Sequence, residues 1–147
     1  MYQEQASTST FTPPMRSSLL VAAAVAFLAA PAAAQKAKWT QIGTTSSGNP
    51  VYVDQKTVKK SGDHVDATIR VVFVKPVETP KGVWMSSRIS GTFDCTARKL
   101  ANRESVYFGD RAEAKVVERK VNKIPGYSVV LGGSLGAIAL DHLCKAK

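Results

Sequence analysis

The sequence predicts an α+β domain: a single antiparallel β-sheet of about five or six strands, with a C-terminal α-helix packed on one face and disulfide-linked to the sheet. Three observations support this fold class. Apolar and polar residues alternate along most of the chain after residue 38, which is typical of strands with one buried face. A helical period of 3.6 appears only after residue 134. Two cysteines, Cys95 and Cys144, lie in these two regions.

Residues 1–34 have the pattern of a secretory signal peptide that is removed after export. Arg16 precedes the apolar run Leu19–Ala30, and small residues follow up to Ala34, which is the order of charge, apolar segment and cleavage site in such peptides. Met15 is a candidate start of translation. The apolar run is too short for a transmembrane helix, which needs about 20 residues.

We therefore expect residues 35–147 to form one domain that is periplasmic or secreted, with no transmembrane segment and no cysteine at its start for a lipid anchor. The chain has 20 Lys+Arg and 11 Asp+Glu, a formal net charge of +9, and the leader removes only Arg16 and Glu4. This charge favours acidic partners such as an acidic glycan, lipopolysaccharide or an acidic protein surface. Nucleic acid is not expected, because there is no basic helix or RNA-binding motif.

Two short strands open the domain. Trp39–Thr44 and Val51–Asp54 are joined by Ser46–Pro50, whose residues favour turns, so the three segments predict a hairpin. The clearest strand begins at His64, after a turn over Lys59–Asp63. Its apolar residues share one face: Val65, Ala67, Ile69, Val71 and Phe73.

The next strand, Val83–Cys95, follows a loop with Pro76, Pro80 and Gly82, and a register can be proposed. Placing Arg70 opposite Arg88 puts the apolar residues of both strands on the same inner face. A slip of one residue would turn the apolar face of one strand outward, so this register is favoured. The resulting inner pairs are Val65 with Phe93, Ala67 with Gly91, Ile69 with Ile89 and Phe73 with Met85, and the single polar exception is Val71 with Ser87. Like charges directly opposite are destabilising unless they are solvated or bridged by an anion, so we expect the two arginines to be exposed.

Two further strands and one helix complete the domain. Lys99–Phe108 has conflicting parity, which would fit a bulge, and Lys115–Val121 is a charged edge strand. Ser134 is a candidate N-cap. The helix after it places one apolar half-circle toward the sheet: Leu135, Gly136, Ala139, Leu140, Leu143 and Cys144, with Ile138 as the one large apolar residue outside it.

Cys95 and Cys144 predict a disulfide, because an even pair of cysteines in an exported protein is typical of a structural bridge. A loop of this length contributes about 4 kcal/mol in the chain-entropy model. The alternative, a catalytic or redox thiol, lacks a Cys-x-x-Cys motif.

Several segments together resemble one known family. They are Trp39, Val51–Asp54, Phe93–Cys95, Pro125–Ser128 and a final helix ending in Leu143-Cys144. In this order they are similar to the surface-adhesin protein E family of Gram-negative bacteria, over residues 38–145. The resemblance implies an antiparallel sheet with a disulfide-linked C-terminal helix. It also implies an adhesin that binds a host matrix protein such as vitronectin or laminin.

The residues themselves favour a binding domain over an enzyme. Arg70, Arg88 and Arg103 are the candidate contacts for an acidic partner on the polar sheet face. The alternative is a small periplasmic hydrolase that uses His64 or His142. Neither histidine has a metal-ligand spacing with the cysteines, and we expect no metal and no cofactor. An exposed sheet edge would also allow a homodimer.

Overall fold

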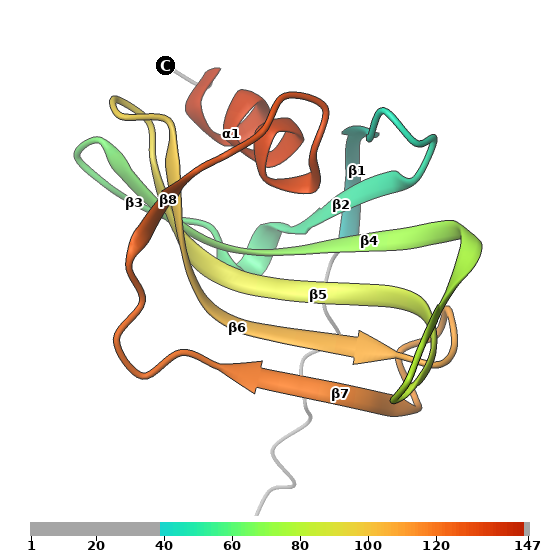
Figure 1. Ribbon diagram of the computed structural model, residues 1–147. Coiled ribbons are helices and arrows are strands. Elements are labelled where there is room, and N and C mark those ends of the chain that lie inside the picture. Colours follow the sequence, from blue (N-terminus) through green and yellow to red (C-terminus); the bar gives the residue numbers. More distant parts are fainter. Residues whose placement is uncertain (1–38, 146–147) are drawn as a thin grey trace, which may run out of the picture. The chain divides into compact units, whose positions relative to one another are not determined.

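The computed structural model describes residues 39–145, and the expected leader with Met15 lies outside them. The predicted architecture is confirmed: one antiparallel sheet carries a C-terminal helix on one face (Figure 1). The elements, in chain order, are β1 (Trp39–Thr44), β2 (Pro50–Asp54), a 3-10 turn η1 (Gln55–Thr57), β3 (Lys59–Ser61), β4 (His64–Thr79), β5 (Gly82–Asp94), β6 (Lys99–Phe108), β7 (Val116–Val121), β8 (Tyr127–Val129) and α1 (Leu135–Lys145).

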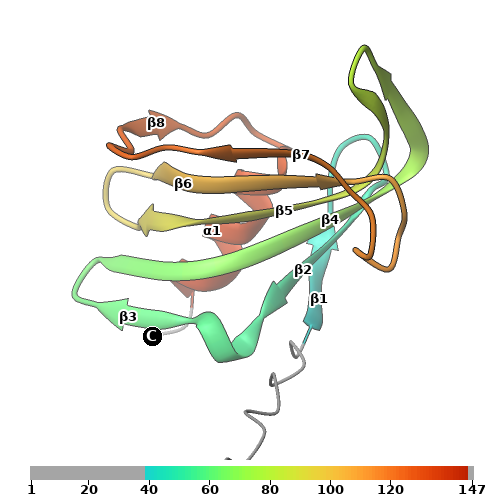
Figure 2. The ribbon, with the colours of Figure 1, turned by 90° about the horizontal axis from the view of Figure 1, so that it is seen from below.

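The sheet has eight strands, more than the five or six predicted. Its order is β1-β2-β4-β5-β6-β7, with β3 paired to β4 and β8 paired to β6. β3 and β8 lie at the same end of the sheet (Figure 2). Both are three residues long and exposed throughout. They were missed because such short exposed strands carry no apolar alternation, and β3 occupies part of the segment predicted as a turn.

The register of β4 and β5 is confirmed over most of its length. Arg70 pairs with Arg88, and the inner pairs run from Val65–Phe93 to Val71–Ser87. The predicted Phe73–Met85 pair is wrong, because the register shifts between Val72 and Val77. Pro76 lies in this irregular stretch, and proline cannot donate a ladder hydrogen bond. Pairing resumes beyond it, so the predicted loop is instead the tip of a longer hairpin.

A bulge in β6 explains the conflicting parity of that segment. Ser90 pairs with Glu104 and Gly91 with Asn102, which leaves Arg103 as the extra residue. The extra residue moves the following side chains to the other face. Leu100 therefore packs against the core beneath α1, whereas Val106 lies opposite Arg88 on the other face. The predicted edge strand is confirmed as β7.

The helix α1 packs against β1, β2 and β4. Its first turn is capped as predicted, since the Ser134 hydroxyl accepts a hydrogen bond from the Ala137 amide at 3.3 Å. The core beneath it is a single apolar cluster whose buried members are Val53, Val65, Ala67, Ile69, Phe93, Ala139, Leu140 and Leu143. Ile138, the apolar exception on the helical wheel, lies against Gly43 of β1, where a Cβ atom would approach Ile138 Cγ2 to 2.7 Å.

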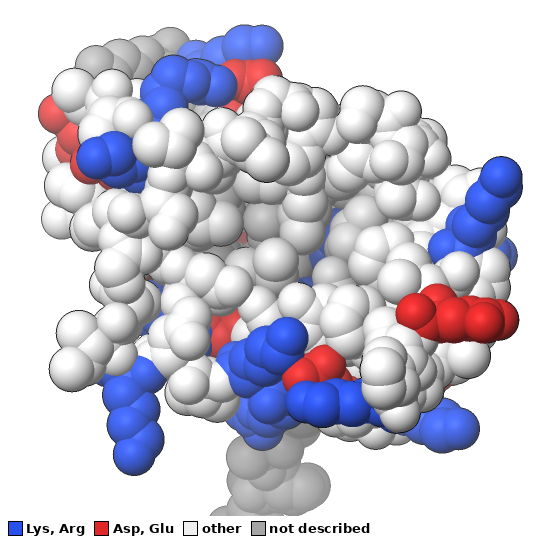
Figure 3. All heavy atoms as spheres, in the orientation of Figure 1, with Lys and Arg blue, Asp and Glu red and all other residues white. Residues whose placement is uncertain are grey.

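The predicted disulfide is confirmed. Cys95 follows β5 and Cys144 lies in the last turn of α1, with their Cα atoms 5.5 Å apart. The helix leaves part of the inner face uncovered, and Figure 3 shows the surface hollowed between α1 with the β1–β2 hairpin on one side and the sheet on the other. No helix within residues 39–145 is long and apolar enough to cross a membrane.

Candidate partner-binding face

The candidate arginines lie on the sheet face opposite α1, here called the outer face. One row of paired residues crosses it from β2 to β7: Tyr52, Arg70, Arg88, Val106 and Arg119. Successive strands present these residues to the same side because paired residues in an antiparallel sheet share a face. Arg70 and Arg88 are thus brought together, whereas Arg103 lies apart from them at the bulge of β6.

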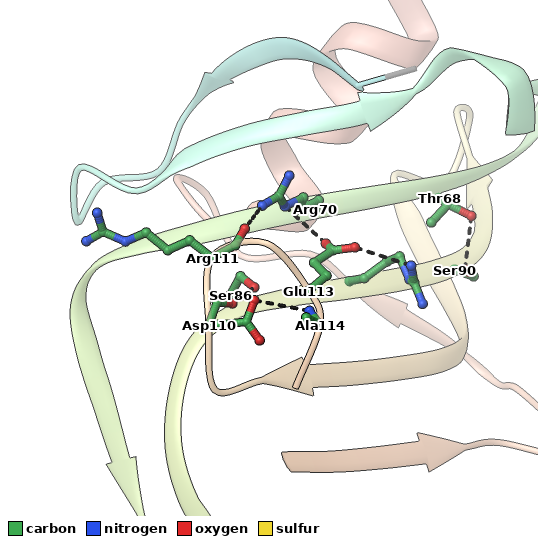
Figure 4. Close-up of polar contacts among 9 residues, drawn as sticks. Thr68, Arg70, Ser86, Ser90, Asp110, Arg111, Glu113 and Ala114 are labelled. Carbon is green, nitrogen blue, oxygen red and sulfur yellow. Dashed lines mark hydrogen bonds and ion pairs between the residues drawn. The ribbon is translucent and has the colours of Figure 1, made fainter. Parts of the chain in front are cut away.

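Glu113 bridges the two facing arginines (Figure 4). Its carboxylate lies 3.0 Å from Arg70 Nε and 3.3 Å from Arg88 Nη1. The Arg70 guanidinium also donates to the Arg111 carbonyl. The side chains of Glu113 and Arg70 are 10% and 17% exposed, and that of Arg88 is 38% exposed. The expected exposure is therefore wrong for Arg70 and holds only in part for Arg88, which is half-buried, because the protein supplies the bridging anion from its own chain.

Aromatic rings fix the positions of the two guanidinium groups. The Arg70 guanidinium lies 5.7 Å from the ring centre of Trp39 and 5.8 Å from that of Tyr52. That of Arg88 lies 5.3 Å from the ring centre of Phe108. Such cation–π contacts stabilise a charged group that is partly removed from water. Arg70 is thus a supporting residue, and Arg88 presents its charge at the surface.

Glu113 reaches the arginines because residues 109–115 fold back over the outer face. The Asp110 carboxylate accepts hydrogen bonds from the amides of Ala114 and Lys115, and the backbone hydrogen bond from Ala114 is the largest cause that holds the pKa of Asp110 below its usual value. The buried Ser86 hydroxyl donates to the Asp110 carbonyl at 2.8 Å. Glu113 itself has a φ of 63°, a left-handed conformation that costs a non-glycine residue on the order of 1 kcal/mol.

The remaining arginines of the outer face also have carboxylate partners. Arg103 is 47% exposed and lies 3.5 Å from Asp66. Arg119 is 65% exposed and pairs with Glu104. With the bridge of Glu113, four arginines face three carboxylates on this surface. Among these four arginines, Arg119, Arg103 and Arg88 keep the most exposed side chains.

The two histidines lie on different elements, His64 at the start of β4 and His142 in the last turn of α1. His64 Nε2 lies 3.7 Å from Asp94 Oδ2, across the β4–β5 pair, and its side chain is 48% exposed. His142 is exposed beside Asp141 and Lys145 of α1. Within residues 39–145, no hydrogen bond joins either ring to a hydroxyl group, and no three His, Cys, Asp or Glu side chains gather as metal ligands.

The sequence did not identify Glu113 as a functional residue. Its signal was indirect: the like-charged pair of Arg70 and Arg88 needed an anion, and nothing in the sequence says which carboxylate supplies it. The residue lies 25 positions after Arg88. Only the fold of residues 109–115 brings its carboxylate back over β4 and β5.

The sequence matches one protein family, and the fold is similar to solved structures. A model of the family described as surface-adhesin protein E matches residues 39–145. The chain is similar to crystal structures of Haemophilus influenzae protein E. For the selenomethionine form the identity is 13%, covering 74% of this chain and 86% of that chain, with a TM-score of 0.49. For protein E from non-typeable H. influenzae the identity is 13%, the coverage 79% and 81%, and the TM-score 0.48. No curated protein matches the chain.

Proposed function

The chain belongs to the surface-adhesin protein E family, and on this premise we propose that it is a non-enzymatic exported domain that binds an acidic partner through its outer face. The family supports an adhesin-like role at the bacterial exterior. Candidate partners are an acidic glycan, lipopolysaccharide or an acidic patch of a host matrix protein. The observation that carries the choice of an acidic partner is the net charge of +9, with arginines gathered on one face of the sheet.

Arg88 and Arg103 are the proposed contact residues. Both point from the outer face and keep 38% and 47% of their side chains exposed. Arg70 contributes by position, because it holds Glu113 and stacks with Trp39 and Tyr52. Arginine suits the contact role, since its planar guanidinium binds carboxylate, sulfate and phosphate groups through two parallel hydrogen bonds.

Heparin and lipopolysaccharide are suitable first probes. We expect the affinity for heparin to fall steeply as salt rises, because exposed charges are screened within about 10 Å at 0.1 M ionic strength. The double variant Arg88→Gln/Arg103→Gln should weaken binding at least fivefold. Lys75→Gln/Lys123→Gln is the matched control, because it removes the same charge from exposed positions outside the outer-face row. Equal losses in both variants would mean that only net charge matters and would reject the site.

The hydrolase alternative has no specific observation in its favour. His64 and Asp94 are near each other, but a base with an oriented partner still requires a nucleophile or an activated water in a concave pocket. The hollow beside His142 is small, about 280 Å³, and its walls are Ile42, Ile138 and charged side chains of α1.

A further inference from the structure

A groove opens on the inner face, on the side of the sheet opposite the arginines. It lies between the β1–β2 turn, the middle of β4 and β5, and the segment that leads into α1 (Figure 3). Its volume is about 380 Å³, which falls within the range of small-molecule sites. The residues that define its chemistry are Ser46, Asn49, Val71, Phe73, Ser87 and Leu135.

Ser87 is the unexpected residue of this groove. It is the one polar exception on the inner face of the β4–β5 pair, opposite Val71, and it is 3% exposed. Within the described residues its hydroxyl forms no hydrogen bond, although it lines the groove. The hydroxyl is not among the fully buried polar atoms that lack a partner, so it reaches solvent through the groove. Ser86, its neighbour on the opposite face, is buried and fully engaged with the Asp110 carbonyl.

Phe73 is also available to the groove because of the irregular pairing of β4. The register shift after Val72 removes the cross-strand partner that an unbroken ladder would give to Phe73. Its ring and the Val71 side chain therefore form an apolar wall, which Leu135 extends from the start of α1. One side of the groove thus offers an apolar surface, and the floor offers an unpaired hydroxyl.

The polar groups of the groove are short and uncharged. Ser46 and Ser47 carry hydroxyl groups, which both donate and accept hydrogen bonds. Asn49 uses its side-chain oxygen to accept from the Val74 amide at 2.9 Å, so its NH₂ group remains available to a ligand. None of the lining residues is Lys, Arg, Asp or Glu. A charged ligand would therefore lose its hydration without a counter-charge, which is costly.

From these features we propose that the groove binds an uncharged sugar residue that carries an apolar substituent, with an N-acetylhexosamine as the fitting class. The sugar hydroxyls match the mixed donors and acceptors of the rim and of Ser87. The acetamido methyl group matches the wall of Val71, Phe73 and Leu135, since an aromatic ring and branched side chains offer apolar contact area. This site is independent of the acidic partner proposed for the outer face.

The test is an NMR titration of the ¹⁵N-labelled, oxidised protein with N-acetylglucosamine. We expect saturable shifts of the amides of residues 45–49, 71–73, 87 and 131–135. Glucose lacks the acetamido group and glucosamine carries a positive charge, and both should bind at least fivefold more weakly. Titration without saturable shifts at these amides would overturn the proposal. The same would follow if an uncharged Ala/Ser peptide bound there and the sugar did not.

Two adjacent serines provide matched variants. Ser87→Ala removes this hydroxyl and breaks no hydrogen bond within the described residues, so we expect a melting temperature close to that of the parent protein and an affinity for N-acetylglucosamine reduced at least fivefold. Ser86→Ala removes the hydrogen bond to the Asp110 carbonyl on the outer face, so it should lower the melting temperature and leave the affinity unchanged. Unchanged sugar binding in a folded Ser87→Ala variant would overturn the role of this residue and the site built on it.

Discussion

Glu113→Gln tests the bridge between the facing arginines most directly. The substitution keeps the shape of the side chain and removes its charge. It leaves Arg70, which is 17% exposed, opposite Arg88 without the carboxylate that lies 3.0 and 3.3 Å from them. The two guanidinium groups then repel each other at adjacent positions of the sheet.

The expected loss of unfolding free energy can be bounded from burial. Removing one partner of a fully buried ion pair costs about 3–5 kcal/mol, whereas exposed pairs are worth about 0.2–1 kcal/mol. Arg70 is mostly buried and Arg88 is 38% exposed, so solvent screens part of the interaction. We expect about 2 kcal/mol between these limits, which corresponds to a drop of about 8 °C in Tm for a domain of this size.

Urea unfolding followed by circular dichroism measures this loss. Adding Arg88→Gln to Glu113→Gln should restore part of the stability, because it removes the repulsion that the first change creates. Glu113→Gly should be about 1 kcal/mol less destabilising than Glu113→Ala, since glycine adopts a φ of 63° without strain. A Glu113→Gln protein within about 0.5 kcal/mol of the parent protein would refute the assignment of Glu113 as the anion that holds the pair.

Three further predictions concern stability. Replacing Cys95 and Cys144 by Ala should lower the free energy of unfolding by about 4 kcal/mol in a urea titration, and a loss below about 1 kcal/mol would contradict the role of the cross-link. The pKa of Asp110 is lowered in the folded state, so the ionised carboxylate stabilises the fold above its unfolded pKa, and this stabilisation is lost as pH falls through the folded pKa. The Tm measured from pH 6 to pH 2 should therefore fall more steeply for the parent protein than for Asp110→Asn. Parallel curves for the two proteins would contradict this role of Asp110. Gly91→Ala should destabilise the domain by about 1–3 kcal/mol, because the new Cβ would lie 2.6 Å from the Ala101 carbonyl oxygen, whereas Gly126→Ala, where the Cβ meets open space, should be close to neutral by thermal melting.

The β4–β5 register was predictable because burial of one face decides it. A slip of one residue would have turned either Val65 and Ile69 of β4 or Phe93 of β5 away from the core, so the correct pairing was strongly favoured. The bulge of β6 left a visible trace in the conflicting parity of its residues. The helix was predictable for a similar reason, since its apolar half-circle is buried only when it faces the apolar side of the sheet.

Features that depend on contacts distant in sequence could not be read from the chain. Ile138 broke the helical pattern, and its explanation is the missing side chain of Gly43, almost a hundred residues earlier. The partial burial of Arg70 depends on the path of residues 109–115. The inner groove depends on the register shift after Val72, because an unbroken ladder would have paired Phe73 with Met85.

The cross-link between Cys95 and Cys144 also decides how the domain carries mechanical load. A force applied to the C-terminal end of α1 is transmitted through the disulfide to Cys95, just after β5, so β6, β7 and β8 do not carry it. Those strands lie within a covalently closed ring, so tension cannot extend them while the bond is intact. A tethered molecule under shear would therefore yield first among the strands that precede Cys95, and reduction would lengthen the extensible chain by the whole of that ring.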